Sequence, residues 1–230
     1  MIQEDFPFID IHTHHQEDTL TSYGIHPWWF DDPAYHPDND LQLLERLLRE
    51  DKLAAIGETG IDKLHPETLA LQIESFEKHI ALSETYQKPL ILHNVKGTET
   101  LLQLHKKHKP GQAWIIHGFN GNENEVRQLV SQGFYLSVGA SLLYENRKIT
   151  KSIKSIPLDY LFFETDTAGN SIGEIYQKAA MLLDLPLAQL KERIFANFAR
   201  LHLTTWKPGT NVPEGDSGTM ALSNRERITF

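Results

Sequence analysis

Seven short apolar runs, separated by longer amphipathic stretches, place the strongest constraint on the fold of this chain. Several of the runs are continuously apolar, which is typical of strands that are covered on both faces. Their alternation with helical periodicity is the pattern of βα units, which build a parallel sheet or barrel. We predict strands over Phe6–Ile11, Leu20–Ile25, Leu53–Gly57, Pro89–His93, Ala113–His117, Phe134–Val138 and Leu158–Phe163.

Apolar residues that recur every three or four positions predict helices between these strands. Three stripes of this kind are formed by Leu41, Leu44 and Leu48, by Leu69, Ile73, Phe76 and Ile80, and by Ile172, Ile175, Ala179 and Leu182. A final pair of helices is expected around Leu187–Ile194 and Asn197–Leu201.

The length of 230 residues suits one α/β domain, because barrels of this class often run to about 200–250 residues. We count seven strands rather than eight, and the connection from His15 to Leu20 is too short for a crossover helix. The prediction is therefore a TIM-type barrel over residues 1–205 that is distorted or has one βα unit reduced. Residues 206–230 lack periodicity, so we expect a loosely ordered tail or an arm that packs elsewhere.

Composition limits the metal ligands, the cellular location and the mode of nucleic-acid binding that we expect. There is no cysteine, so a metal ion would have to be held by imidazole and carboxylate groups. We see no apolar run of about 18 residues and no signal peptide, and we expect a cytoplasmic protein with no membrane partner and no evident obligate protein partner. The net charge is −9 without a basic stripe, so a nucleic acid would be held at only a few phosphates.

Histidines and carboxylates stand at or just after the ends of five predicted strands. In a parallel barrel these ends lie together on one face, where active sites are built. Residues far apart in the sequence are therefore expected to converge. The residues in question are His12, His14, Glu58, His93, His117, Glu164 and Asp166.

The types of these residues favour a metal centre. His12 and His14 lie two apart at a strand end, so both side chains should point to the same side and chelate an ion. Glu58, between two glycines that would let the chain turn after the strand, can bridge two cations with its two oxygens. Asp166 can bind an ion and accept a proton from the attacking water, while Glu164 has a supporting role. The alternatives are ordinary ones: solvent-exposed histidines, a helix N-terminal acid and a turn aspartate.

His93 and His117 each follow a run of buried-strand residues, and their matched positions favour metal ligands over core histidines. Asp62 is expected to support a ligand rather than to be one. His26 would contact substrate or orient a ligand. Further candidates for substrate binding are Lys96, which would touch a phosphate, Asn120 in the glycine-flanked loop after His117, and Trp28, which would stack on a base or pack at the barrel mouth.

The motifs HTH, GIHP, GETGID, PLILH, HGFNG and ETD occur in this order, followed by NFARL. Together they resemble the TatD-like metal-dependent hydrolases, which belong to the amidohydrolase-type barrels, over roughly positions 6–202. The resemblance implies a distorted TIM-type barrel that binds two divalent cations and hydrolyses phosphodiester bonds in DNA. It also implies that His12, His14 and Asp166 bind one ion, that His93 and His117 bind the other, and that Glu58 bridges them.

The chain departs from the family pattern in three places. The unit before GIHP is shortened; Val95 and then Lys96 stand where the family often has an arginine; and the proline- and basic-rich loop after ETD is absent. Imidazole and carboxylate ligands suit Zn²⁺ or Mn²⁺, and a water-rich second site would admit Mg²⁺. We therefore expect a metal-dependent hydrolase that acts as a deoxyribonuclease. The alternatives are a hydrolase of a small phosphoester, amide or lactone, or a non-catalytic metal-binding protein.

Overall fold

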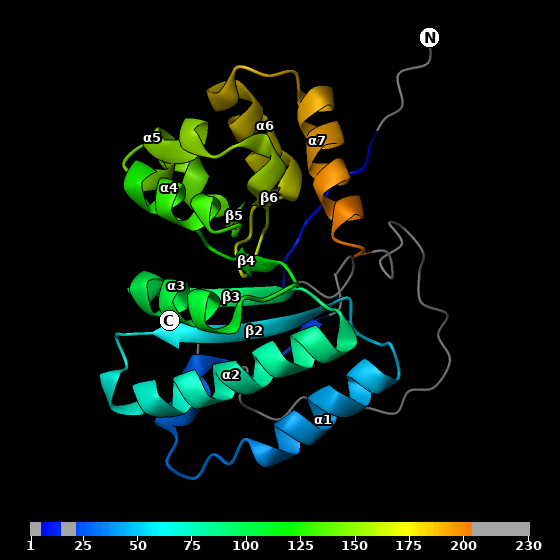
Figure 1. Ribbon diagram of the computed structural model, residues 1–230. Helices are drawn as coiled ribbons and strands as arrows, with labels where there is room; N and C mark the ends of the chain where they lie inside the picture. Colours follow the sequence, from blue (N-terminus) through cyan, green and yellow to red (C-terminus); the bar gives the residue numbers. More distant parts are fainter. Residues whose placement is uncertain (1–5, 15–21, 204–230) are drawn as a thin grey trace.

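A computed structural model describes residues 6–14 and 22–203 of the chain. It has one sheet of parallel strands whose spatial order is their order in the sequence, with helices packed around it (Figure 1). The strands are β1 (Ser22–Tyr23), β2 (Ala55–Asp62), β3 (Leu90–Val95), β4 (Trp114–Ile116), β5 (Tyr135–Val138) and β6 (Leu161–Phe163). The prediction of an α/β parallel architecture is confirmed.

The three apolar stripes lie on helices α1 (Asp38–Arg49), α2 (Leu69–Tyr86) and α6 (Ile172–Leu183), and further helices stand between the other strands. The remaining α-helices are α3 (Thr98–His108), α4 (Glu123–Ser131), α5 (Lys148–Ser152) and α7 (Leu187–Arg200). The short 3₁₀ helices are η1 (Pro27–Asp31), η2 (Pro66–Thr68), η3 (Ala140–Leu143), η4 (Ile153–Ser155) and η5 (Leu158–Tyr160). The predicted final pair is wrong: one continuous helix, α7, covers both segments, because neither Gly nor Pro interrupts it.

The first predicted strand, Phe6–Ile11, is also wrong as a regular strand. The segment instead runs beside β6 and the residues after it, held by three backbone bonds of 3.0 Å: Ile11 N–H to Phe163 O, Asp166 N–H to His12 O and His14 N–H to Asp166 O. An isolated parallel bridge joins Thr13 to Asp166. The strands of the sheet do not themselves close the ring within the described residues. The prediction of a distorted barrel is confirmed.

Strand β2 is longer than the sequence indicates, because it continues through Glu58 to Asp62 instead of ending at Gly57. The glycines do not turn the chain there. They let β2 approach β3: a Cβ on Gly57 would lie 2.4 Å from the carbonyl oxygen of Ile91, and one on Gly60 would lie 2.1 Å from that of His93. Both glycines also have positive φ, at +150° and +144°. This close approach places Glu58 beside the ligand candidates of β3.

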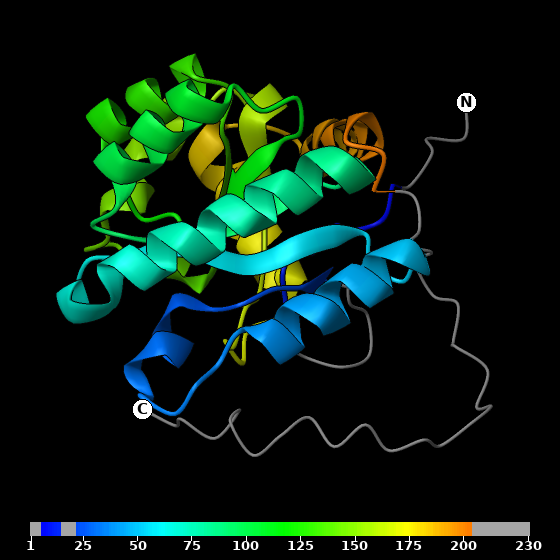
Figure 2. The same ribbon diagram turned by 60° about the horizontal axis from the view of Figure 1, so that its bottom comes forward.

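The core lies between the sheet and its helices. In both views α2 runs along β2, and α1 lies next to it (Figures 1 and 2). Ile91, Ile115 and Leu136 on neighbouring strands are fully buried, as are Phe76 of α2 and Leu44 of α1. Burial on this scale fixes the strand ends that carry the polar residues, because removing apolar surface from water is the main favourable term in folding.

Helix α2 also holds the segment that leads to η1. The buried His79 accepts a hydrogen bond at Nε2 from the backbone N–H of Ile25 (3.0 Å), and its Nδ1 lies 2.7 Å from the carbonyl oxygen of Ser75. Since a backbone N–H only donates, the proton of the neutral ring is on Nδ1. Burial lowers the pKa of His79 to about 4. The residue after Ile25 is His26, so this bond helps to position a candidate site residue.

The predicted tail, residues 206–230, lies outside the described residues. Leu20 and Thr21 of the second predicted strand also lie outside them. In the described part of the chain, no helix combines the length and the apolar character needed to cross a membrane.

Replacing Gly60 by alanine tests the close approach of β2 and β3. We expect Gly60→Ala to lower the free energy of unfolding by roughly 2–5 kcal/mol, from overpacking against His93 and from strain at positive φ. Gly169→Ala is the matched control, because nothing lies within 4 Å of the added Cβ. Its free energy of unfolding should differ from that of the unmodified protein by no more than about 0.5 kcal/mol. Urea denaturation measures both. Equal effects would contradict the close approach.

The neutral, buried His79 should make stability depend on pH. Histidine in the unfolded chain takes up a proton near pH 6.5, whereas folded His79 does so only near 4. Its contribution is therefore complete above about pH 6.5 and is lost as the pH falls toward 4. From pH 7 to pH 5 the free energy of unfolding should fall by roughly 2 kcal/mol more in the unmodified protein than in His79→Gln. The exposed His36→Gln is the control. Parallel losses in the protein and in His79→Gln would refute the expectation.

Candidate metal centre

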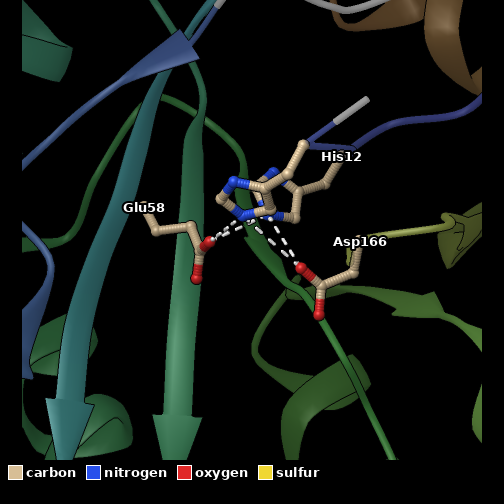
Figure 3. A group of neighbouring side chains, drawn as sticks. His12, Glu58 and Asp166 are labelled. Carbon is tan, nitrogen blue, oxygen red and sulfur yellow. Dashed lines mark hydrogen bonds and ion pairs between the residues drawn. The ribbon is translucent and has the colours of Figure 1, made fainter. Parts of the chain in front are cut away.

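A first group of side chains meets where the N-terminal segment runs beside the end of β6. His12, His14, Glu58 and Asp166 each offer one ligand atom, all within 4.8 Å of one another. Oε1 of Glu58 lies 2.9 Å from Nε2 of His12 and 3.1 Å from Nε2 of His14. Oδ1 of Asp166 lies 3.7 and 3.5 Å from the same two nitrogens. The carboxylates of Glu58 and Asp166 point toward the imidazole of His12 from two sides (Figure 3).

The other oxygen of Glu58 faces a second group of imidazoles. Oε2 lies 2.7 Å from Nε2 of His117, 3.7 Å from Nε2 of His26 and 3.9 Å from Nδ1 of His93. His93 is on β3, His117 directly follows β4, and His26 precedes η1. Glu58 thus lies between two histidine groups, with one oxygen toward each.

The charges at the centre are coupled. Burial alone would raise the pKa of Glu58, but the positive His117 and hydrogen bonds from His117, His12 and His14 hold it well below its usual range. Burial would lower the pKa of His117, yet Glu58 and Glu164 raise it well above its usual value. A hydrogen bond to Glu58 raises the pKa of His14 as well. A buried carboxylate therefore draws positive charge into this centre.

Two of the imidazoles are kept neutral by their surroundings. Burial lowers the pKa of His26 to about 3, and burial together with the nearby His117 lowers the pKa of His93. Neutral imidazole is the form that binds metal ions. Burial raises the pKa of Asp166, whose side chain remains 36% exposed and accessible to water.

Two further carboxylates lie behind the histidines. Asp62 Oδ2 lies 3.0 Å from Nε2 of His93 and accepts a hydrogen bond from the indole N–H of Trp28 (2.7 Å). Glu164 Oε1 lies 3.7 Å from Nδ1 of His117 and accepts from the N–H of Gly118. Both carboxylates are buried. Each therefore stands on the side of an imidazole that faces away from Glu58, where it can orient the ring.

Sequence reasoning missed Asp10. Its Oδ1 accepts from the N–H of Thr165 (3.0 Å) and its Oδ2 from the hydroxyl of Thr165 (2.7 Å), so it ties the N-terminal segment to the residue before Asp166. Burial raises its pKa to about 6, although the bonds from Thr165 act in the opposite direction. A carboxylate inside the apolar run FIDI was the available signal.

The remaining candidates lie in different surroundings. Trp28 is 38% exposed, and its ring centroid lies 4.8 Å from that of His26 and 5.6 Å from that of His93. Lys96 is exposed and directly follows β3. The side-chain oxygen of Asn120 accepts a hydrogen bond from the N–H of Ile149 (3.1 Å).

The donor atoms of both groups suit a divalent cation. Imidazole nitrogens and carboxylate oxygens are the usual ligands of Zn²⁺ and Mn²⁺ in a protein without cysteine. Glu58, whose side chain is largely buried, presents its two oxygens to different sets of nitrogens, as a bridging carboxylate requires. The residues present therefore fit bound metal.

Curated relatives align with most of this chain. One from Haemophilus influenzae, described as an uncharacterized metal-dependent hydrolase, is 30% identical over 152 residues, which is 63% of this chain and 57% of that protein. YcfH of Escherichia coli strain K12, with the same description, is 28% identical over 202 residues, or 81% of this chain and 74% of that protein. The chain thus spans between about half and three quarters of these relatives.

Solved structures share the fold. YjjV, a TatD homologue from Escherichia coli K12, superimposes with a TM-score of 0.70 at 24% identity, over 78% of this chain and 75% of that one. A TatD family hydrolase from Entamoeba histolytica gives a TM-score of 0.65 at 22% identity, over 79% and 74% of the two chains. The sequence model of the TatD related DNases matches residues 8–202. The chain belongs to the TatD related DNase family.

Proposed function

We propose that this protein hydrolyses phosphodiester bonds with two divalent cations held at the centre around Glu58. The position of Glu58 carries the proposal. Oε1 faces His12 and His14, and Oε2 faces His117 and His93, so one carboxylate adjoins two sets of ligands. Removing a carboxylate from water is unfavourable, and packing alone would not compensate for it. Two bound cations would.

Each ligand has a place in the proposal. His12, His14 and Asp166 would hold one ion, His93 and His117 would hold the other, and Glu58 would bridge the two. When bound, the ions lower the pKa of the attacking water and stabilise the charge that develops on the phosphoryl group. We propose Zn²⁺, Mn²⁺ or Mg²⁺ as the cations.

Asp166 is proposed as the general base. Its carboxylate lies beside His12 and His14, and at 36% exposure it is the more accessible of the two acids in that group, since Glu58 is only 10% exposed. A base must be within reach of the proton that it removes from water, and the side chain must be open to that water. The exposure of Asp166 supports the second condition, and its place beside His12 and His14 would bring it near a water bound to an ion held there. Glu58 would keep its bridging position.

DNA is the proposed substrate, on the strength of the family to which the chain belongs. A small phosphoester is the second candidate, and the charge of the chain favours it. The net charge is −9, whereas proteins that bind long stretches of phosphate backbone use basic surfaces. His26, Lys96 and Asn120 are proposed to contact the substrate, with Lys96 supplying a positive charge for one phosphate.

Removing the bridging carboxylate tests the centre. Glu58→Ala and Glu58→Gln should both lose bound metal and turnover, by more than the roughly 10–100-fold typical of residues that only orient ligands. Metal content after dialysis and hydrolysis of bis(4-nitrophenyl) phosphate with added Mn²⁺ measure the two effects.

Glu45→Gln is the matched control, because it neutralises an exposed acid on α1. It should retain both metal and activity. Full activity in Glu58→Gln would remove the bridging role, and an unmodified protein that neither binds Mn²⁺ nor hydrolyses any ester would refute the enzymatic proposal.

The choice of substrate has its own test. If DNA is the substrate, single-stranded oligonucleotides should be cleaved in Mn²⁺ with a larger kcat/KM than bis(4-nitrophenyl) phosphate, and Lys96→Ala should lower the value for the oligonucleotide alone. Lys106→Ala, on the exposed part of α3, is the control for charge. Hydrolysis of the small ester with no cleavage of DNA would favour the second candidate.

A further inference from the structure

Four hydrogen bonds form a closed ring that begins and ends at Trp28. The indole N–H of Trp28 and Nε2 of His93 both contact Oδ2 of Asp62, at 2.7 and 3.0 Å. Nδ1 of His93 lies 3.2 Å from Nε2 of His26, and Nδ1 of His26 accepts from the backbone N–H of Trp28 at 3.2 Å. The donors in this ring can be assigned, because the indole N–H and the backbone N–H only donate and an ionised carboxylate only accepts.

One side of the ring is fixed by Asp62. Its Oδ2 accepts from the indole of Trp28, and its Oδ1 accepts from the backbone N–H of Leu64 (2.9 Å). Indole and backbone N–H groups only donate, and a carboxylate that takes donors at both oxygens is favoured in its ionised form. Ionised Asp62 has no proton to give, so His93 must donate from Nε2. In the neutral ring, Nδ1 of His93 is then without a proton.

The other side is fixed by the backbone of Trp28. Its N–H donates to Nδ1 of His26, so that nitrogen carries a lone pair and the proton of neutral His26 is on Nε2. This Nε2 faces Nδ1 of His93 at 3.2 Å. A protonated nitrogen on His26 thus meets an unprotonated one on His93. The proton placed by the Trp28 backbone and the lone pair placed by Asp62 are thus complementary where His26 meets His93.

We propose that Asp62 and the backbone N–H of Trp28 lock both histidines in the tautomer protonated at Nε2 but turn them in opposite directions, so that His93 faces the centre with the lone pair of Nδ1 and His26 faces it with the proton of Nε2. Asp62 is in this sense a positioning residue for His93. In the metal-free chain, the hydrogen-bond partners in this ring assign the tautomers of the two neutral imidazoles.

The lock gives His26 and His93 different roles, although both lie near Glu58. His26, Glu58 and His93 offer ligand atoms close enough together to hold an ion. Only His93 can do so through the nitrogen that faces the group, because Nε2 of His26 carries hydrogen. In the metal-free chain the Nε2 proton of His26 points at Nδ1 of His93. Once an ion occupied that Nδ1, His26 could donate the proton to another acceptor, such as a phosphoryl oxygen. These roles, unlike the tautomers, rest on the proposed function.

Nitrogen NMR of the metal-free protein tests the tautomers directly. In protein labelled with ¹⁵N-histidine, with signals assigned by His26→Gln and His93→Gln, both rings should be protonated at Nε2 and unprotonated at Nδ1. A His93 protonated at Nδ1, or a His26 protonated at Nδ1, would overturn the proposal. This measurement needs no metal and no activity, so it stands whatever the protein hydrolyses.

Two variants test what sets the lock. The side chain of Asn in Asp62→Asn has only one acceptor oxygen. It can therefore serve either the N–H of Leu64 or the donors of Trp28 and His93, but not both. We expect His93 to become a mixture of tautomers in this variant. Trp28→Phe keeps the carboxylate and the backbone N–H, so both tautomers should persist. Trp29→Phe, at the neighbouring position, is the matched control. An unchanged His93 in a folded Asp62→Asn protein would overturn the role of Asp62; should that variant not fold, the results for the unmodified protein and Trp28→Phe still decide.

Metal titration separates this inference from the proposed function. Asp62→Asn should weaken binding of one Mn²⁺ about 10–100-fold and leave the other unchanged, because His12 and His14 do not contact Asp62. Equal weakening of both ions, or of neither, would contradict the positioning role. If the unmodified protein binds no Mn²⁺ while its tautomers are as expected, the proposed function fails and the lock stands.

Discussion

The burial of the Glu58 carboxylate among imidazoles is the interaction on which the rest of the centre depends. A carboxylate that leaves water must be compensated by charge and hydrogen bonds. Here His117, His12 and His14 supply both, and they hold the pKa of Glu58 well below its usual range. In turn Glu58 raises the pKa of His117 and His14. The centre therefore has one fixed negative group to which the surrounding nitrogens are oriented, and that is a suitable environment for a cation.

The backbone around Glu58 makes this arrangement possible. Glu58 lies within β2, between two glycines that allow β2 and β3 to approach more closely than any side chain would permit. The register shift between Ile56 and Thr59 occurs at the same place. A strand of regular spacing would hold its side chains farther from the next strand. Local irregularity in β2 thus brings a carboxylate next to His93, and apolar burial on the helix side keeps the two strands in place.

Much of this could be predicted from the sequence, because strand ends in a parallel sheet converge and the polar residues there are conspicuous after apolar runs. Other features depend on tertiary contacts. The segment at Phe6 is apolar enough for a strand, yet it makes only a few backbone bonds to β6 and the residues after it. Gly57 resembles a strand end, whereas its role is close approach. Asp10 and the bond from Trp28 to Asp62 could not be found by periodicity, because each joins residues that only the fold brings together.

The incomplete barrel is compatible with a complete set of candidate ligands because of where the irregularity falls. His12 and His14 lie in the N-terminal segment before β1, and the other candidates lie on β2, on β3, directly after β4 and just beyond β6. Backbone bonds between the N-terminal segment and residues 163–166 hold His12 next to Asp166 without a regular strand pair. Asp10 adds a side-chain tie to Thr165 at the same junction. The N-terminal segment therefore carries His12 and His14 to the other candidates although it forms no regular strand.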